Sequence, residues 1–188
     1  MQMKSVDIRI VKSRALILDA LLELMKDKAY AEISITELAE EACVARQTIY
    51  RNFSGKDEIL LHYMDGVFDG YFRDIVDMMH RKEYIGDMSM SLLRIWKENK
   101  KLFLALQGAG LIHKTLERFS QYALMLQKHL DTRSGKKSVH HAYAAHFIAG
   151  GTYMVLSKWF QDNMKVPVEE MGDLFSEIGR FALEIIRR

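Results

Sequence analysis

The sequence predicts an all-α protein in which a small N-terminal helix-turn-helix head of three helices precedes a larger C-terminal helical body, about nine helices altogether. Apolar residues recur with helical spacing along most of the 188 residues. Proline occurs once, and hydrophobic residues make up 49% of the chain. This length and composition fit a folded helical protein with a substantial core better than a disordered one.

The first helix is predicted over residues 5 to 27. It carries an apolar stripe with the spacing of one buried helix face: Ile17, Ala20, Leu21, Leu24 and Met25. The second helix begins near residue 35, because Ser34 and Glu37 have the spacing of a capping box, in which the serine accepts a bond from the Glu37 amide and the glutamate reaches back. It ends by about residue 42, and its inward face is short: Leu38, Ala39 and Ala42.

Three residues separate the second helix from a third, which is predicted over residues 46 to 52 with Ile49 and Phe53 facing inward. Two short helices joined by such a turn form a helix-turn-helix. A fourth helix begins near Lys56, because Asp57 and Glu58 then occupy its first turn, where the helix dipole favours acidic side chains. We therefore expect a head over residues 1–55 and a body over residues 56–188.

The body is predicted to follow a connection over residues 81–89 with helices over 89–99, 101–108, 111–131, 139–163 and 168–187. The polar segment 132–138 predicts an exposed loop, and Pro167 suits the start of the last helix. Cys43 is the only cysteine, which excludes an intrachain disulfide. The charged N-terminus and the lack of any run of roughly 18 apolar residues predict a cytoplasmic protein with no membrane partner.

The net charge of +2 does not indicate a nucleic-acid partner by itself. Residues 1–57 contain nine basic and nine acidic side chains, counting Lys and Arg against Asp and Glu. A DNA-binding function must therefore depend on where the charges fall along the chain.

Residues 14–61 resemble the TetR family of bacterial transcriptional regulators. The most specific part contains two motifs, Thr-Ile-Tyr-x-x-Phe over residues 48–53 and Lys-Asp-x-Ile-Leu over residues 56–60. Two positions depart from the family, because Cys43 stands where glycine is usual and Ala45 where a capping serine or threonine is usual. Each departure is expected to cost about 1 kcal/mol. Residues 147–171 resemble a subgroup common in low-GC Gram-positive bacteria.

The resemblance implies that the third helix enters the major groove of DNA. Arg46 and Gln47 would read base edges, since arginine pairs with guanine and glutamine with adenine by two bonds each. The other residues expected at the interface include candidates for phosphate contacts on either strand: Ser34, Thr36, Thr48, Tyr50, Arg51, Asn52 and Lys56. For each residue taken alone the alternative is a structural role, as a solvated charge, a packed ring or half of an ion pair.

The resemblance also implies a homodimer on a near-palindromic operator, with the last two helices of each chain forming a four-helix interface. One small head with few cationic contacts would bind a half-site weakly, whereas paired heads double the contacts. The residues expected at this interface are small or apolar: Ala142, Ala145, Ala149, Gly150, Tyr153, Leu174, Phe175, Ile178, Phe181 and Ile185. The alternative is that they only complete the core of one chain.

The middle helices carry aromatic residues and methionines that suit irregular apolar ligands. A pocket for a small apolar or aromatic effector is expected among seven of them: Tyr71, Trp96, Phe103, His113, Tyr122, Met125 and Met154. Core packing explains the same residues equally well.

Neither a metal site nor a cofactor is expected. His141 and His146 stand five residues apart rather than four, and the sequence contains neither GxSxG nor HExxH. We therefore expect no enzymatic activity. The resemblance implies a transcriptional regulator, most often a repressor, that is released when an effector shifts the fourth helix. The alternatives are an activator or helical interaction protein that recruits a partner protein through its body, and a small helical enzyme with its active site there.

Overall fold

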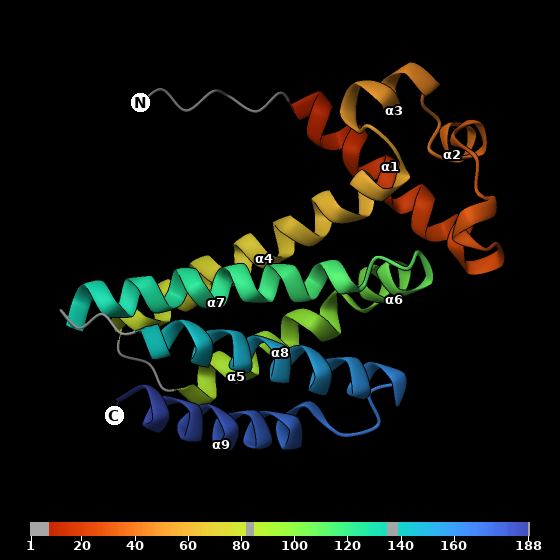
Figure 1. Ribbon diagram of the computed structural model, residues 1–188. Coiled ribbons are helices and arrows are strands. Elements are labelled where there is room, and N and C mark those ends of the chain that lie inside the picture. The colour runs from red at the N-terminus through yellow and green to blue at the C-terminus, as the bar shows by residue number, and fades with distance from the viewer. Residues whose placement is uncertain (1–7, 82–84, 135–138, 188) are drawn as a thin grey trace. The chain divides into compact units, whose positions relative to one another are not determined.

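The computed structural model describes residues 8–81, 85–134 and 139–187; the side chains of 79–81, 85–87, 126–127, 129–134, 139–141 and 181–187 lie outside this description. These ranges contain nine α-helices, one short 3-10 helix and no β-strand (Figure 1). The predicted all-α class is confirmed.

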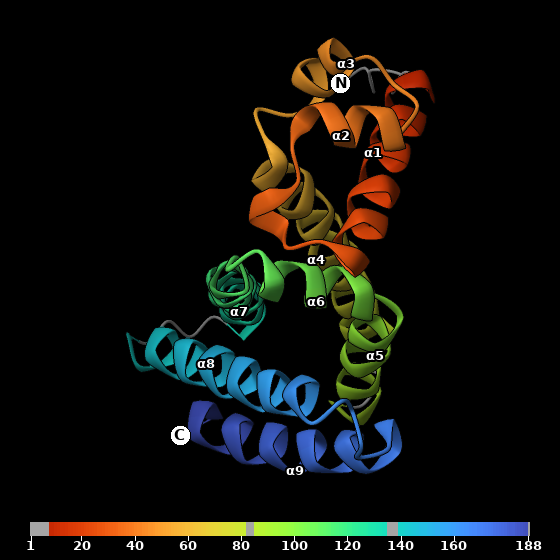
Figure 2. The same cartoon turned by 90° about the vertical axis from the view of Figure 1, so that its right-hand side faces the viewer.

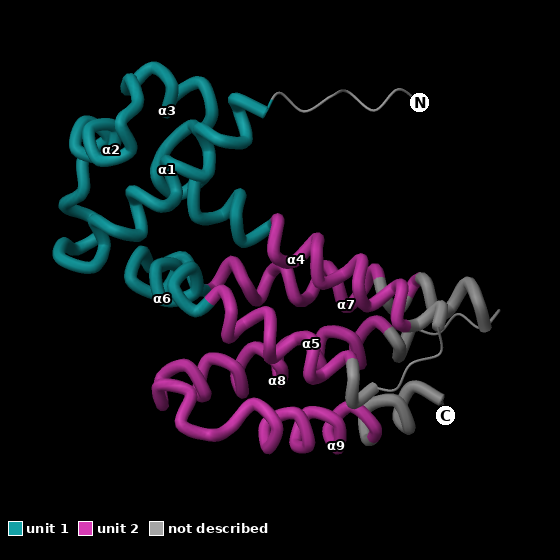
Figure 3. The backbone as a smooth tube through the Cα atoms, turned by 180° about the vertical axis from the view of Figure 1, so that it is seen from behind, with its two compact units in different colours: residues 1–65, 100–112 teal, residues 66–99, 113–188 magenta. Residues whose placement is uncertain are grey.

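The chain forms two compact units. The first contains residues 1–65 and 100–112, and the second contains residues 66–99 and 113–188 (Figure 3). The predicted division at residues 55 and 56 would place α6 (Lys100–Gly108) in the body, whereas α6 packs against α1 (Ile8–Asp27) within the first unit. Contacts between segments so far apart in the chain leave no trace in the local spacing of apolar residues, on which the prediction relied.

The first unit is built on the apolar stripe of α1. After α1 follow the 3-10 helix η1 (Tyr30–Glu32), α2 (Ile35–Glu41) and α3 (Arg46–Asn52), and α1 contacts both α2 and α3. Ile17 and Leu21 of α1 are fully buried, as are Leu38 of α2 and Ile49 of α3. Four aliphatic side chains from three helices therefore form the centre of this unit.

Helix α4 (Lys56–Arg81) begins in the first unit and continues into the second, which also contains α5 (Ile85–Glu98), α7 (His113–Ser134), α8 (Val139–Gln161) and α9 (Val168–Arg187). Helix α7 packs on α8, and α9 packs on α5 and α8. The ring of Trp96 is buried and stacks on Phe119 with centroids 5.7 Å apart. It meets Phe160 edge-on at 5.1 Å. Such pairs contribute about 0.5–1.5 kcal/mol beyond their buried area.

Most predicted helices coincide with observed ones, and two borders within the described residues differ by more than two residues. Helix α5 begins at Ile85, inside the predicted connection over 81–89, and α7 extends to Ser134, into the predicted loop over 132–138. Residues 135–138 of that loop lie outside the described residues. Polar segments were interpreted as connections, but a helix tolerates polar residues wherever tertiary packing of its other face stabilises it.

The packing of α9 on α5 requires glycine at one position. A Cβ atom built on Gly172 would lie 2.1 Å from Met90 Sδ, far inside van der Waals contact. The absence of a side chain at residue 172 therefore makes room for the methionine.

Gly172→Ala is expected to destabilise the second unit by about 1–3 kcal/mol, because the added methyl group displaces Met90 or the α9 backbone. The control is Gly66→Ala in α4, where a Cβ would meet nothing within 4 Å. The control should be neutral or stabilise by up to about 1 kcal/mol. Chemical denaturation measures both. Combining Gly172→Ala with Met90→Ala should cost less than the sum of the single variants, and strict additivity would contradict the contact.

Candidate DNA-binding site

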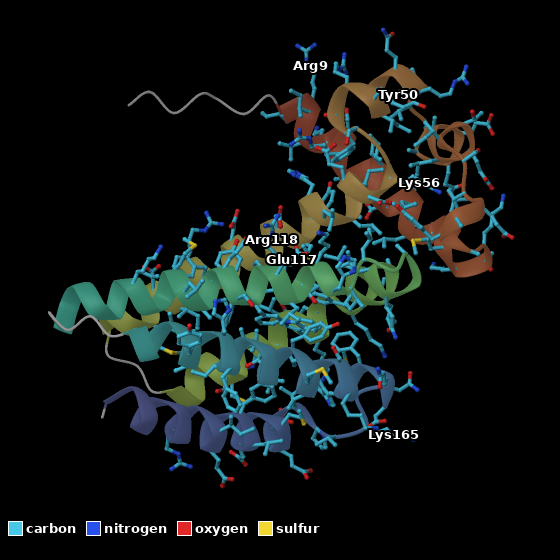
Figure 4. The ribbon with its side chains drawn as sticks, viewed as in Figure 1. Arg9, Tyr50, Lys56, Glu117, Arg118 and Lys165 are labelled. Atoms are coloured by element: carbon cyan, nitrogen blue, oxygen red, sulfur yellow. The ribbon has the colours of Figure 1, made fainter. Side chains whose placement is uncertain are left out.

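Helix α3 has one buried and one exposed face. Ile49 is 0% exposed and Phe53, at the C-terminal cap, is 2% exposed. The exposed residues share the opposite face, because positions i, i+1, i+4 and i+5 lie together on a helix: Arg46, Gln47, Tyr50 and Arg51. Figure 4 labels Tyr50 on α3, and 59% of this residue is exposed. The unit therefore presents one aromatic and three hydrogen-bonding side chains on two turns of helix.

The turn between α2 and α3 is a Schellman motif. The Val44 amide donates to the Ala39 carbonyl at 2.9 Å, and the Cys43 amide donates to the Glu40 carbonyl at 3.1 Å. This motif needs one residue in the left-handed region, which favours glycine. Cys43 occupies that position with a φ of 51°, and Ala45 provides no side-chain cap for α3. The expectation that this turn lacks its φ-tolerant residue is confirmed.

The start of α2 is held by the predicted capping box. Ser34 Oγ accepts a hydrogen bond from the Glu37 amide at 3.1 Å, and Lys28 Nζ donates to both carboxylate oxygens of Glu37 at 2.9 Å. Hydrogen bonding to Lys28, with a further bond from the Ser34 backbone, holds the pKa of the Glu37 carboxyl below its ordinary value. Thr36 and Arg46 are both exposed, and Arg46 Nη1 donates to Thr36 Oγ1 at 3.4 Å.

Lys56 joins the segment before α2 to the first turn of α4. Its ammonium donates to the carbonyl of Tyr30 at 2.6 Å and to that of Ile33, and lies 4.5 Å from the centre of the Tyr30 ring. The Tyr30 hydroxyl donates to the Asp57 carboxylate. Burial, and then the bond and charge of Asp57, raise the pKa of Tyr30, so the hydroxyl stays a donor at neutral pH. We call these four residues the lysine clamp; Figure 4 labels its lysine.

Besides Ser34, Thr36 and Arg46, two more of the residues expected at the DNA interface have internal partners. Asn52 is 8% exposed, and its side-chain amide donates to the Thr48 carbonyl at 2.8 Å, which supports the last turn of α3. The Lys56 ammonium belongs to the clamp. Thr48 itself is half-buried beside the exposed face. Helical spacing did not reveal the partners of Lys56, because the clamp carbonyls lie more than 20 residues before it.

Arg14 and His62, which the sequence analysis did not select, hold the end of α3. The Arg14 guanidinium carbon lies 5.5 Å from the centre of the Phe53 ring, and the His62 ring lies 5.8 Å from it. Arg14 Nη1 and His62 Nε2 are 3.4 Å apart. Burial, and then the charge of Arg14, lower the pKa of His62, so its ring is neutral at pH 7 and able to accept that bond. No spacing rule relates residues 14, 53 and 62.

A cavity of about 130 Å³ lies within the second unit. Aromatic side chains of α4 and α7 form much of its wall: Tyr71, Phe72, Phe119 and Tyr122. The Tyr122 hydroxyl donates to the Asp69 carboxylate, and its ring stacks on Phe68 with centroids 5.6 Å apart. Two of the seven residues expected in a ligand pocket, Tyr71 and Tyr122, thus line this cavity.

The other five expected pocket residues lie elsewhere. Trp96 belongs to the aromatic core, and Phe103 is buried in α6 of the first unit. His113, Met125 and Met154 are exposed. Residue type alone selected them, and aromatic or sulfur-containing side chains serve equally well in a core, a cavity or an exposed face.

The residues expected at a dimer interface differ in how far the chain itself buries them. Ala145, Ala149 and Phe175 are buried within the chain itself, so they complete its core. Ala142, Gly150 and Tyr153 are half-buried, and Leu174 and Ile178 are exposed. The side chains of Phe181 and Ile185 lie outside the described residues.

Helix α8 carries a more exposed apolar face than the one expected. Tyr143, Phe147 and Met154 are 72%, 75% and 65% exposed. Their spacing of i, i+4 and i+11 places them on one side of the helix. We call them, with Leu174 and Ile178 of α9, the apolar α8–α9 face.

The described residues contain no group of three or more His, Cys, Asp or Glu side chains that could hold a metal ion. In that same part of the chain, no helix is both long and apolar enough to cross a membrane.

Cys43→Gly is expected to stabilise the first unit by roughly 0.5–1 kcal/mol. A left-handed conformation costs an L-residue about 1–2 kcal/mol, and the greater freedom of glycine in the unfolded chain offsets part of that gain. Cys43→Val should destabilise the unit, because a β-branched side chain fits this φ worse. Chemical denaturation with a probe in the first unit measures the free energy of unfolding of each variant. Equal stability of the glycine and valine variants would contradict backbone strain at residue 43.

Two family models match the chain. Residues 17–63 match the model described as bacterial regulatory proteins, tetR family, and residues 83–180 match one described as transcriptional regulator C-terminal region. The HTH-type dhaKLM operon transcriptional activator DhaS of Lactococcus lactis is 26% identical over 132 residues, which cover 68% of this chain and 66% of DhaS. The uncharacterised HTH-type regulator YxbF of Bacillus subtilis is 21% identical over 175 residues, 88% of this chain and 44% of YxbF. The chain thus spans less than two thirds of either relative.

Solved structures share the fold. DhaS has a TM-score of 0.63 and 18% identity, covering 93% of this chain and 96% of its own. FadR from Bacillus subtilis in complex with stearoyl-CoA has a TM-score of 0.64 and 17% identity, covering 87% and 96%. NalD, the secondary repressor of the MexAB-OprM efflux pump in Pseudomonas aeruginosa, has a TM-score of 0.58 and 16% identity, covering 94% and 96%. Because family models match both the helix-turn-helix and the helical body, the protein belongs to the TetR family of DNA-binding transcriptional regulators.

Proposed function

We propose that the protein is a homodimeric repressor, which binds a near-palindromic operator through α3 of each chain and releases it when a small apolar molecule binds the second unit. The exposed face of α3 carries this proposal. Its hydrogen-bonding side chains are solvated, while Ile49 on the opposite face is fully buried. A helix held in this way offers one face to a major groove without losing its own support.

The positions on α3 suggest separate roles. Arg46 and Gln47, at the helix N-terminus, read base edges. Tyr50, Arg51 and the half-buried Thr48 contact phosphate oxygens, as do Ser34 and Thr36 at the start of α2. Asn52 and Lys56 position these elements through their internal bonds and do not contact DNA.

The apolar α8–α9 face supports the dimer. Phe147 and Met154 are among the most exposed apolar side chains of the described residues, and an exposed contiguous apolar patch marks an interaction surface. A two-fold axis would place the same patch of two chains against each other. We assign this face to the interface in place of Ala145 and Ala149, which the chain already buries.

The aromatic cavity of the second unit supports a small effector. Its volume of about 130 Å³ is below the roughly 300–1,000 Å³ of pockets for drug-sized ligands, and near that of cavities that bind a single aromatic ring. We therefore propose an uncharged molecule of about one ring, whose binding shifts α4. Nothing as long as the stearoyl-CoA in the FadR complex fits this volume.

Activation is the second candidate function, because the relative DhaS is an activator. An activator of this type would recruit a partner protein through its body. A reporter gene behind the selected operator distinguishes the two, since a repressor lowers expression and an activator raises it.

Selection of bound duplexes from a random pool tests the operator. The wild-type protein is expected to enrich a near-palindrome. Arg46→Ala should lower affinity by about 1–3 kcal/mol per half-site and relax the choice at one base pair in each half. Arg51→Ala should weaken all duplexes alike and reduce the slope of log K against log salt by about 2, because a dimer loses two phosphate contacts.

Lys165→Ala is the matched control, since it removes one exposed positive charge before α9 in the second unit (Figure 4). Neither the enriched sequence nor the salt slope should change. If Arg46→Ala and Arg51→Ala behave like this control, α3 does not make the proposed contacts.

Phe147→Arg is expected to convert the dimer to a monomer, because it places a charge on the apolar α8–α9 face at its most exposed apolar side chain. A monomer binds the operator through one head only. Its operator affinity should therefore fall by about 10²-fold to 10⁴-fold, which is the increase that linking two heads provides. Sedimentation equilibrium measures the first effect and operator titration the second. Gln161→Arg, at the exposed end of α8, is the control. A wild-type protein that sediments as a monomer at all concentrations overturns the assignment.

A further inference from the structure

A groove of about 360 Å³ lies between α1 and α6 in the first unit, apart from the α3 surface. Leu22, Met25 and Lys26 of α1 form the first wall, which Ala29 continues just after the end of that helix. One stripe of α6 forms the other: Lys101, Leu104, Ala105 and Gly108. The α6 residues have the spacing i, i+3, i+4 and i+7, and the α1 residues have the spacing i, i+3 and i+4, so each helix turns a single face toward the groove. Figure 2 shows α6 beside the C-terminal end of α1.

The groove combines apolar walls with a cationic rim. Its lining includes Lys26, Lys28 and Lys101 and no acidic side chain. Lys26 pairs with Glu23 and Lys28 with Glu37. The structure gives Lys101 no acidic partner among the described residues, so its ammonium is available to an anion.

The apolar part has unfilled space. Leu104 is 43% exposed, although it lies in the wall. A Cβ on Gly108 would only touch Met25 Cε, at 3.6 Å, so the glycine leaves room that a side chain would occupy. A volume of this size lies within the range of small-molecule pockets.

We propose that this groove binds a small amphipathic carboxylate, with its hydrocarbon chain between α1 and α6 and its carboxylate at Lys101. Lys101, which has no acidic partner among the described residues, and the lack of acidic lining select a negative head group. The opposed aliphatic faces select a chain of methylene groups over a polar body. This site is separate from the effector cavity, which is lined by residues of the second unit.

Occupancy bears on the DNA-binding helices from within their own unit. Ala29 and Tyr30 also line the groove, and the Tyr30 carbonyl accepts a hydrogen bond from the Lys56 ammonium of the lysine clamp. A ligand that presses on this segment alters the support of α2. The effect on operator binding rests on the proposed function, whereas the binding of the carboxylate does not.

Calorimetry with octanoate on the full-length protein tests the site. Octanoate is expected to bind about tenfold more tightly than hexanoate, which has two fewer methylenes, and several-fold more tightly than 1-octanol, which has no charge. Lys101→Gln should weaken octanoate about fivefold and leave 1-octanol unchanged. Lys165→Gln in the second unit is the control and should change neither the affinity for octanoate nor that for 1-octanol. The ε-methyl NMR signal of Met25 should shift on titration.

Two further variants address the walls. Gly108→Leu fills the groove, and Leu104→Glu, at an exposed position, repels the carboxylate; each should reduce octanoate affinity at least tenfold, with circular dichroism verifying the fold. The proposal is overturned if octanoate does not bind at millimolar concentration, or if it binds equally to Lys101→Gln, Gly108→Leu and Leu104→Glu. If operator selection fails, the proposed function is wrong, but the calorimetric test of carboxylate binding does not depend on that outcome.

Discussion

Burial of one face of α3 is the constraint on which the DNA-binding unit depends. A helix of seven residues is not stable alone, because nucleation costs more than so few bonds return. Ile49 and Phe53 supply the missing stability by packing into the unit, and Arg14 and His62 cover the Phe53 ring. Only because these contacts hold the inner face can the outer face consist of solvated polar side chains.

The lysine clamp supports α2 and α3 from the segment that precedes them. It fixes residues 30 to 33 against α4, and Ser34 begins α2 directly after them. The orientation of α2, the turn and α3 thus follows from backbone carbonyls held by a single ammonium. A charge that satisfies two carbonyls and faces an aromatic ring is far less free for phosphate than an exposed lysine.

Local patterns in the sequence predicted most of the helices and little of the tertiary detail. The Ser34 cap and the inward positions of Ile49 and Phe53 follow from spacing, and the structure confirms them. Of the predicted α1 stripe, Ile17, Ala20 and Leu21 are buried, whereas Leu24 and Met25 are half-buried. The place of α6 in the first unit, the partners of Lys56 and the buried state of Ala145 depend on contacts between distant segments. The periodicity of apolar residues does not predict such contacts, and residue type did not distinguish a cavity wall from a core.

The strained turn has a practical consequence. Cys43 is the only cysteine of the chain, and it is exposed at the corner between α2 and α3. A maleimide dye or a nitroxide can therefore be attached beside the recognition helix without prior mutagenesis. In a dimer, fluorescence energy transfer or electron paramagnetic resonance would measure the distance between the two probes. A change in that distance on addition of an effector would report a change in the separation of the two heads.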